Sequence, residues 1–435
     1  MNALSYVSTF LSAHQIVISG AIFSACYLLI AFEQIVKLSK SALALFCGGT
    51  LWIYAASFTT LNIKEALPEA ASGIFAIIIF LFCAMSLVEI LVHYRFFDIV
   101  RQKLYRLHLS DRGQFLLITV LAFFLSAILD NMTTTIIMIQ ISRKFFKGEN
   151  LLVTGAAIVV AANAGGAFSP FGDVTTIMLW FAEKYTWDQI LLQGFLPSFA
   201  LFLVTVGLMF PRIKQESLKI EQEIIHSLTK GELTVVIACF LSFPLPLVMT
   251  MLGIEPYMGL VIGLSVVWML TDIFKRNSTV FTHSFEMKEL LHKVDNEAIY
   301  FFIGILLAVG ALHYLGTLHA LAGDVYGSNP GISAFIIGNT ILGLMSAVLD
   351  NVPLTDMAIK MNALSSSDFW ILLALTVGTG GSLFSIGSAA GVVASNMLDK
   401  EGLKFWKYIK ITFIPGIIGY AVGIFVWYVQ FSLLH

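Results

Sequence analysis

Charged residues are scarce in this chain. Asp, Glu, Lys and Arg make up only 12% of the 435 residues, whereas an ordinary soluble domain has about 25%. Hydrophobic residues make up 58%, so a soluble globular protein is excluded. The formal net charge of -2 leaves no basic excess that would hold a phosphate backbone, and we expect no nucleic-acid partner.

Cysteine is also scarce. The four cysteines, Cys26, Cys47, Cys83 and Cys239, all fall in apolar segments, so they cannot form an exposed disulfide framework. No Cys/His spacing of a metal site is present, and we expect no resident cofactor. The first 32 residues contain no Lys or Arg, so the basic region of a cleavable signal peptide is missing. We therefore expect the first apolar helix to be retained.

Apolar runs long enough to cross a bilayer recur along the whole chain. A crossing helix needs about 20 apolar residues, and the continuous runs lack the alternation of transmembrane β-strands. The sequence therefore predicts an all-α polytopic membrane protein embedded in lipid. We expect about ten crossing helices, at residues 15–36, 41–58, 71–92, 151–182, 190–210, 233–252, 257–272, 298–318, 369–397 and 411–433.

Two further apolar segments, 113–142 and 332–361, do not fit a simple crossing. Asp130-Asn131 interrupts the first near its middle, and Asp350-Asn351 interrupts the second. A straight helix of about 30 residues would reach roughly 45 Å at about 1.5 Å per residue, which is too long for the bilayer. We therefore predict two re-entrant hairpins, the first hairpin and the second hairpin, with their tips at mid-membrane.

The flanking charges support this reading, because a re-entrant hairpin returns to the side from which it entered. Asp324 and Asp368 flank the second hairpin with Lys360 as its only base, so both of its ends are expected outside. Both ends of the first hairpin are expected to be cytoplasmic, because bases flank it on both sides: Arg106, Arg112, Arg143, Lys144 and Lys147.

Because Lys and Arg gather on the cytoplasmic side of membrane proteins, their positions also predict an orientation for the whole chain. Of the 25 Lys and Arg residues, all but Lys64, Lys184 and Lys360 then lie on the cytoplasmic side. We expect a multi-pass protein of the cell inner membrane, with both chain ends outside and the linker 212–232 in the cytoplasm.

The two halves of the chain repeat each other. Ser-Ala-Ile-Leu-Asp-Asn at 126–131 matches Ser-Ala-Val-Leu-Asp-Asn at 346–351, and 165–172 matches 380–387. Each half holds five crossings and one hairpin, and an odd number of crossings inverts the second half. We therefore predict inverted repeats at 1–211 and 233–435, an arrangement typical of secondary transporters.

The predicted helices 151–182 and 369–397 contain Gly, Pro, Ser and Thr at their centres, so each should be interrupted at mid-membrane. One such break is often only a packing kink. Two breaks in register with two hairpins favour an ion site, because irregular backbone is tolerated at this depth only where it is buried in protein or lines a cavity. Free carbonyls together with Ser, Thr, Asn and Asp oxygens suit a hard cation.

Three carboxylates, Asp130, Asp173 and Asp350, are expected to lie deep in the membrane. A buried carboxylate must be paired, hydrogen-bonded or protonated, and one that exchanges H⁺ for a cation has the minimal chemistry of an antiporter. Asp130 and Asp350 could also cap half-helices, a role compatible with ion binding. Asp173 aligns with Ser388, so one half of the site should be acidic and the other mainly neutral.

With these motifs, the sequence resembles the NhaD-type sodium/proton antiporters of the ion transporter superfamily. The resemblance rests on 126–135, 162–176, 346–356 and 378–388. It implies a transporter of Na⁺ or Li⁺ and H⁺ rather than an enzyme. It also implies a scaffold that holds a homodimer, and an elevator-like shift of the site.

The resemblance further implies an ion site drawn from both halves. Relatives that carry dicarboxylates have a Ser-Asn-Thr pattern at the hairpin tips, and the aspartate that replaces this serine here would repel an anion. The first half would contribute Ser126, Asp130, Asn131, Thr134, Asn163, Ser169 and Asp173. The second half would contribute Ser346, Asp350, Asn351, Thr355, Asp356, Thr379, Ser382, Ser385 and Ser388.

Other functions stay open at this point. The same scaffold could export another solute, such as arsenite or a dicarboxylate, and a passive channel is disfavoured because inverted broken helices suit alternating access. Two membrane aspartates could also belong to an intramembrane aspartyl protease, in which two carboxylates face one water. Phe171-Gly172-Asp173 lacks the first glycine of the Gly-x-Gly-Asp pattern that such proteases resemble.

Overall fold

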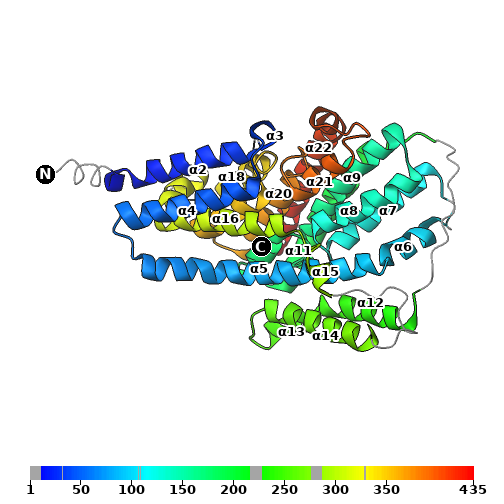
Figure 1. Ribbon diagram of the computed structural model, residues 1–435. Coiled ribbons are helices and arrows are strands. Elements are labelled where there is room, and N and C mark those ends of the chain that lie inside the picture. The colour runs from blue at the N-terminus through cyan, green and yellow to red at the C-terminus, as the bar shows by residue number, and fades with distance from the viewer. Residues whose placement is uncertain are drawn as a thin grey trace.

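The computed structural model describes residues 11–31, 33–105, 107, 109–215, 228–275, 287–327 and 330–435, and every regular element within them is a helix (Figure 1). Seven spans in this part of the chain are long and apolar enough to cross a membrane: Lys40–Phe58, Ile63–His93, Trp187–Arg212, Lys230–Met251, Tyr257–Phe274, Asn296–Tyr314 and Phe405–Leu434. The predicted all-α polytopic membrane architecture is confirmed.

The first half begins with α2 (Gln15–Ala31), α3 (Glu33–Val36), α4 (Lys40–Phe58), α5 (Ile63–His93) and α6 (Phe96–Tyr105). It continues with α7 (Asp111–Ser126), α8 (Asn131–Phe145), α9 (Gly148–Gly166), α10 (Val174–Phe181), α11 (Trp187–Met209) and a 3-10 turn at Phe210–Arg212. The first hairpin is therefore α7 and α8, and the helix predicted at 151–182 is interrupted between α9 and α10.

The second half begins with α12 (Lys230–Ser242), α13 (Leu245–Met251), α14 (Tyr257–Lys275), α15 (Met287–Leu291), α16 (Asn296–Tyr314) and α17 (Thr317–Tyr326). It continues with α18 (Ile332–Met345), α19 (Asn351–Met361), α20 (Ser367–Gly380), α21 (Ala389–Met397) and α22 (Phe405–Leu434). The second hairpin is therefore α18 and α19, and the helix predicted at 369–397 is interrupted between α20 and α21.

Several helix bounds differ from the sequence prediction. Helix α5 begins eight residues before position 71 and α22 begins six residues before position 411, because each continues beyond its apolar run. The helix predicted at 233–252 is divided at Phe243-Pro244, since proline supplies no backbone donor. The helix predicted at 298–318 ends at Tyr314, and α17 follows it after the left-handed Gly316 (φ +81°).

The two outer ends of the first hairpin lie on one side of the molecule. Near the start of α7, the Arg112 Nε donates a hydrogen bond to the Ile213 carbonyl oxygen at 3.2 Å. Just beyond the end of α8, the Asn150 Nδ2 donates to the Lys214 carbonyl oxygen at 2.8 Å. Both ends therefore meet the same short segment after α11, as a re-entrant hairpin requires.

The outer ends of the second hairpin meet around the start of α20. The ring centroid of Phe335, in the first turn of α18, lies 4.7 Å from that of Phe369 at the start of α20. The Lys184 Nζ donates to Asn362 Oδ1 at 2.8 Å, directly after α19, and lies 4.8 Å from the ring centroid of Trp370. This hairpin therefore also returns to the side on which it began.

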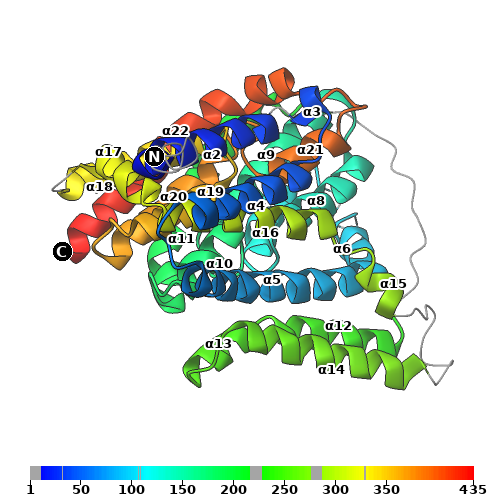
Figure 2. The ribbon, with the colours of Figure 1, turned by 60° about the vertical axis from the view of Figure 1, so that its left-hand side comes forward.

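The helices form two groups that are each built from both halves of the chain. The core helices are α7 to α11 and α18 to α22, in which α11 runs along α22. The scaffold helices are α2, α4, α5, α12 to α14 and α16, in which α4 runs along α16. Figure 2 shows α12, α13 and α14 at the periphery, where α12 and α14 pack against α5 and α13 packs against α14.

Glycine pairs make the same close contacts in both halves. A Cβ atom on Gly166 would lie 2.6 Å from the Gly172 carbonyl oxygen, and a Cβ on Gly381 would lie 2.6 Å from the Gly387 carbonyl oxygen. Each chain break therefore folds back on the end of the preceding helix at a distance that only glycine permits.

These contacts give a first prediction. Gly166→Ala and Gly381→Ala should each destabilise the protein by about 1–3 kcal/mol, because overpacking forces the backbone apart. The measurement is the thermal midpoint of the detergent-solubilised protein, followed by size-exclusion after heating. Gly207→Ala in α11 is the control, since nothing lies within 4 Å of its Cβ position. Equal midpoints for all three variants would refute the close contact.

Candidate ion-binding site

Four short helices, α8, α10, α19 and α21, begin where the chain resumes after a hairpin tip or a helix break. Their N-cap residues are Asp130, Asp173, Asp350 and Ser388. The capping role considered for Asp130 and Asp350 is confirmed. Each cap accepts a backbone hydrogen bond from the first turn of its own helix: Asp130 from Thr133 (2.8 Å), Asp173 from Thr175 (2.9 Å), Asp350 from Val352 (3.0 Å) and Ser388 from Gly391 (3.2 Å).

The Asp173 carboxylate joins the tips of both hairpins. The Asn131 Nδ2 of the first hairpin donates a hydrogen bond to Asp173 Oδ2 at 2.7 Å. The Asn351 Nδ2 of the second hairpin donates to Asp173 Oδ1 at 3.1 Å and to Oδ2 at 3.0 Å. Since Asp173 is only 1% exposed, these amides replace the water that a carboxylate would otherwise require.

The hydrogen bonds continue from Asp173 to Ser388. The Asn131 Nδ2 also donates to Asn163 Oδ1 at 3.0 Å, and the Asn163 Nδ2 donates to Ser388 Oγ at 3.0 Å. We call Asn131, Asn163, Asp173, Asn351 and Ser388 the central cluster. All five side chains are buried, and the serine occupies in the second half the position that Asp173 occupies in the first.

The three deep carboxylates are not neutralised by bases. Among the described residues, none of Asp130, Asp173 and Asp350 lies within salt-bridge distance of a Lys, Arg or His. Their compensation comes mainly from hydrogen-bond donors and from helix N-termini, whose positive partial charge favours an anion, and Lys40 adds a longer-range electrostatic attraction at Asp350. Such a site can take up either a proton or a hard cation.

A cavity of about 240 Å³, the first cavity, leads to these groups between the core and the scaffold. Asp130, Asn131 and Asp350 line it together with Lys40 at the start of α4 and Glu297 at the start of α16, whereas Asp173 does not. An ion in this cavity would therefore meet the two hairpin-tip carboxylates first, with Asp173 buried behind Asn131.

The two tip carboxylates have different partners. The Thr133 hydroxyl donates a second hydrogen bond to Asp130 at 2.5 Å, but the aligned position in the second half is Pro353, which has no hydroxyl. Asp350 instead meets the scaffold, because its backbone N–H donates to the Tyr27 hydroxyl oxygen at 2.7 Å. The two tips are therefore similar in backbone but different in charge compensation.

Most of the predicted hydroxyl residues bond to backbone carbonyls close to the tips and breaks. The Ser126 hydroxyl donates to the Ala162 carbonyl oxygen at 2.7 Å, and the Ser346 hydroxyl donates to Val377 at 2.8 Å, so each hairpin is fastened to its broken helix. The other carbonyl contacts are Ser169 to Ala127 (2.5 Å), Thr355 to Asn351 (2.8 Å), Thr379 to Leu375 (2.5 Å) and Ser382 to Thr379 (2.6 Å).

Three predicted residues stand apart from this pattern. The buried Thr134 hydroxyl has no hydrogen-bond partner in the described part of the chain, so its oxygen is free for a ligand. Ser385 is buried in the break between α20 and α21. Asp356 is not brought to the central cluster, because it lines another cavity and forms an ion pair with Lys360 at 2.6 Å.

Three residues around the carboxylates, Thr133, Thr175 and Tyr27, were not among the predicted site residues. The Thr175 hydroxyl donates to Asp173 Oδ1 at 3.0 Å, and its place two residues after a candidate aspartate was an available signal. Tyr27 could not have been found in this way, since 323 residues separate it from Asp350.

Comparison with known proteins extends over nearly the whole chain. The model of a family described as citrate transporter matches residues 27–378. Sodium/proton antiporter 2 of Arabidopsis thaliana is 32% identical over 420 residues, which cover 93% of this chain and 97% of the relative. Na(+)/H(+) antiporter NhaD is 31% identical in Alkalimonas amylolytica, over 86% of this chain and 82% of the relative. The protein of that name in Vibrio cholerae is 29% identical, over 93% and 89%.

The central cluster predicts binding that a thermal shift can measure. Na⁺ at 100 times its Kd should add about 2.7 kcal/mol to the stability of the detergent-solubilised protein. The shift should grow as the pH is raised, because H⁺ competes with the cation for the carboxylate.

Asp173→Asn should abolish this thermal shift, whereas Asp356→Asn should keep it, because Asp356 lies in the other cavity. Choline chloride at the same ionic strength is the salt control. Loss of the shift in Asp356→Asn but not in Asp173→Asn would contradict this placement of the site.

Proposed function

The chain belongs to the citrate-transporter family and to its NhaD-type sodium/proton antiporters, and we propose that it exchanges Na⁺ or Li⁺ for H⁺ across a membrane. The observation that carries this proposal is the buried Asp173 carboxylate, which accepts hydrogen bonds from amides of both hairpin tips. A single carboxylate that the tips of both hairpins hold can bind one ion and present that ion to each side of the membrane in turn. The activity is transport, and we propose no enzymatic reaction.

The charge balance at the centre favours one monovalent cation. The N-termini of α8, α10, α19 and α21 each carry about +0.5 of an elementary charge, so together they offset about two of the three carboxylate charges. A net charge of about -1 remains, and a buried uncompensated charge is costly. Bound H⁺ or bound Na⁺ removes this cost, whereas an empty site does not. Because the empty site stays costly, the protein must replace one ligand by the other, and Na⁺ is therefore exchanged for H⁺.

The amides supply a way to alternate between the two ligands. Asn131 and Asn351 donate hydrogen bonds from their Nδ2 groups to the Asp173 carboxylate. Rotation of either amide about its last side-chain bond would replace a donor by the Oδ1 acceptor. Carboxylate and amide oxygens with the free Thr134 hydroxyl form the oxygen shell that a hard cation prefers.

We propose that the ion site consists of the central cluster, the tip carboxylates Asp130 and Asp350, and the surrounding hydroxyls. The remaining members are Ser126, Thr134, Ser169, Ser346, Thr355, Thr379, Ser382 and Ser385. Most of these hydroxyls donate to backbone carbonyls and keep their oxygen lone pairs available, so they serve as positioning residues or ligands. Asp356 is better suited to the opposite route, where Lys360 accompanies it.

The alternative substrates fit this charge distribution less well. A citrate or another dicarboxylate in the first cavity would face Asp130 and Asp350 directly, and like charges are strongly disfavoured there. An aspartyl protease needs two carboxylates that share one water, but here the carboxylates cap three separate helices. Both features favour a cation.

We further propose the orientation and the assembly. The first cavity would open to the cytoplasm, because it reaches the ends of the scaffold helices beside Lys40. The core helices would shift against the scaffold in an elevator-like movement, and the scaffold would hold a homodimer in the inner membrane. The inverted repeats would comprise residues 1–211 and 233–435, joined by the cytoplasmic linker 212–232.

The transport proposal predicts a response of inverted membrane vesicles. Addition of Na⁺ or Li⁺ should dissipate a preset pH gradient, seen as dequenching of a pH-sensitive dye. Asp130→Ala and Asp173→Ala should abolish the response, because each removes a carboxylate that balances the helix ends. Asp324→Ala, which changes an exposed carboxylate at the end of α17, should leave it unchanged. Wild-type vesicles that contain inserted protein and show no cation-dependent dequenching would refute the antiporter.

The proposed orientation is tested by labelling single cysteines. With the four buried cysteines replaced by alanine, a cysteine at Lys147 should resist an impermeant maleimide added outside intact cells. A cysteine at Glu183, which is also exposed, should react. The opposite result at Lys147 would contradict a first hairpin that returns to the cytoplasmic side.

A further inference from the structure

A second cavity, of about 470 Å³, lies at the other end of the scaffold helices. Glu69 near the start of α5, His313 near the end of α16 and Glu255 before α14 line it. The core contributes Asp356 and Lys360 of α19, which form an ion pair at 2.6 Å. This cavity therefore has a charged lining, as the first cavity has at Asp130, Asp350 and Lys40.

The two cavities approach each other along the same three helices but do not meet. On α5, residues 80–88 line the first cavity and 69–77 the second. On α16, residues 298–302 line the first and 306–314 the second. On α10, Ile177 lines the first and Met178 the second. No described residue lines both.

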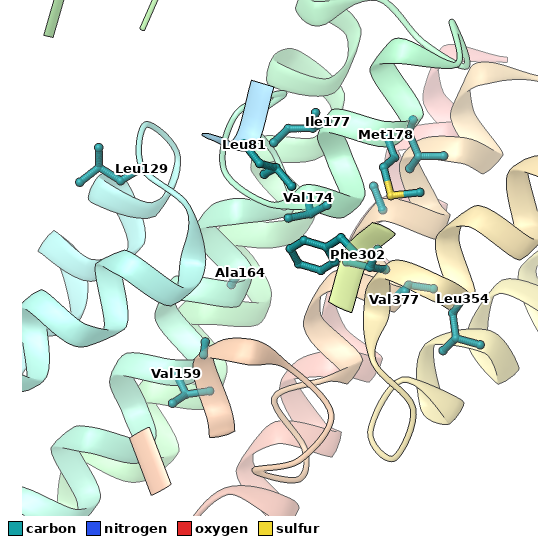
Figure 3. Packing of buried hydrophobic residues seen from close by; sticks show 14 of the residues in the cluster. Leu81, Leu129, Val159, Ala164, Val174, Ile177, Met178, Phe302, Leu354 and Val377 are labelled. Carbon is teal, nitrogen blue, oxygen red and sulfur yellow. The ribbon is translucent and has the colours of Figure 1, made fainter. Parts of the chain in front are cut away.

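The side chains at this boundary are all apolar. We call them the apolar plug. Six of them are 9% exposed or less, and Ile77 is half-buried. Figure 3 shows Leu81, Ile177, Met178 and Phe302 gathered together, with Val174 beside them. The plug consists of Ile77, Phe80 and Leu81 on α5, Ile177 and Met178 on α10, and Phe302 and Leu306 on α16.

We propose that the apolar plug couples the exchange by keeping the two cavities separate. The nearest lining residues of the two cavities are three apart on α5, at Ile77 and Phe80, and four apart on α16, at Phe302 and Leu306. At about 1.5 Å per residue the barrier along the scaffold is therefore about one helical turn, or roughly 4.5–6 Å, thick. An apolar constriction of this kind stops ions while it stays dry, since a charge inside it loses its hydration. Ions and protons therefore cross only when the core helices, α10 among them, carry them past the part of the plug that the scaffold helices α5 and α16 contribute.

The role of the plug rests on the proposed antiport, but the two can be tested separately. Both cavities have charged linings that water can solvate, so the plug is the apolar interruption between them. A polar or shortened plug side chain would let water connect the two cavities. Na⁺ would then flow down its gradient with no matching H⁺, while the central cluster stayed intact.

The test is a pair of neighbouring substitutions on α16 in proteoliposomes. Leu306→Ala shortens a plug residue, and Ile305→Ala makes a similar deletion at a buried position that lines neither cavity. The measured quantities are ²²Na⁺ uptake down its gradient and the simultaneous H⁺ release reported by an internal pH dye. Met178→Ala on α10 provides a second plug variant if Leu306→Ala does not fold.

Leu306→Ala should raise the ratio of Na⁺ taken up to H⁺ released by roughly tenfold, because a wet constriction conducts. Ile305→Ala should keep the wild-type ratio, and Leu306→Met, which restores the apolar volume, should also keep it.

A wild-type ratio in both Leu306→Ala and Met178→Ala would overturn the plug while leaving the antiport intact. If the wild type moves no ions but Leu306→Ala admits Na⁺, the plug stands and the antiport is overturned. If neither the wild type nor any variant takes up Na⁺ or releases H⁺, the plug proposal is overturned.

Discussion

The structure depends on keeping one carboxylate, that of Asp173, inside a membrane protein without water. An ionised group there must receive donors from the protein itself. Asp173 receives them from the backbone and hydroxyl of Thr175 and from the amides of Asn131 and Asn351. Bringing those two amides to one point requires a hairpin tip from each half of the chain. The close glycine contacts that fold each chain break back on its helix, at Gly166 and Gly381, follow from the same requirement.

The two halves share a backbone but not a charge distribution, and the difference gives the centre its chemistry. Asp173 and Ser388 cap equivalent half-helices, so four converging helix ends are balanced by three carboxylates rather than four. With a fourth carboxylate, the site would carry about two uncompensated negative charges and would favour a divalent ion or a second proton. With serine, the deficit is about one charge. The serine at position 388, where the first half has an aspartate, therefore supports the proposed binding of one monovalent cation or one H⁺.

Much of this could be predicted from the sequence, because charge patterns and helix breakers are local signals. The hairpin tips, the two interrupted helices and the capping aspartates follow from the Asp-Asn repeats and the glycine-rich segments. Contacts between distant segments do not follow in this way. Asn351 meets Asp173 across 178 residues and Tyr27 meets Asp350 across 323, and no sequence period reports such partners. Asp356 shows the same limit: its spacing from Asn351 on α19 did not reveal that it would line the second cavity with Lys360.

The charge balance and the apolar plug impose separate conditions on transport. The proposed charge balance makes it costly for the centre to be empty, so it favours a centre that always holds H⁺ or a cation. The plug makes the movement necessary, because it separates the cavities at Leu81 and Phe302 on one side and at Ile77 and Leu306 on the other. A barrier of about one helical turn between the cavities supports the proposed elevator-like shift of the core helices relative to the scaffold.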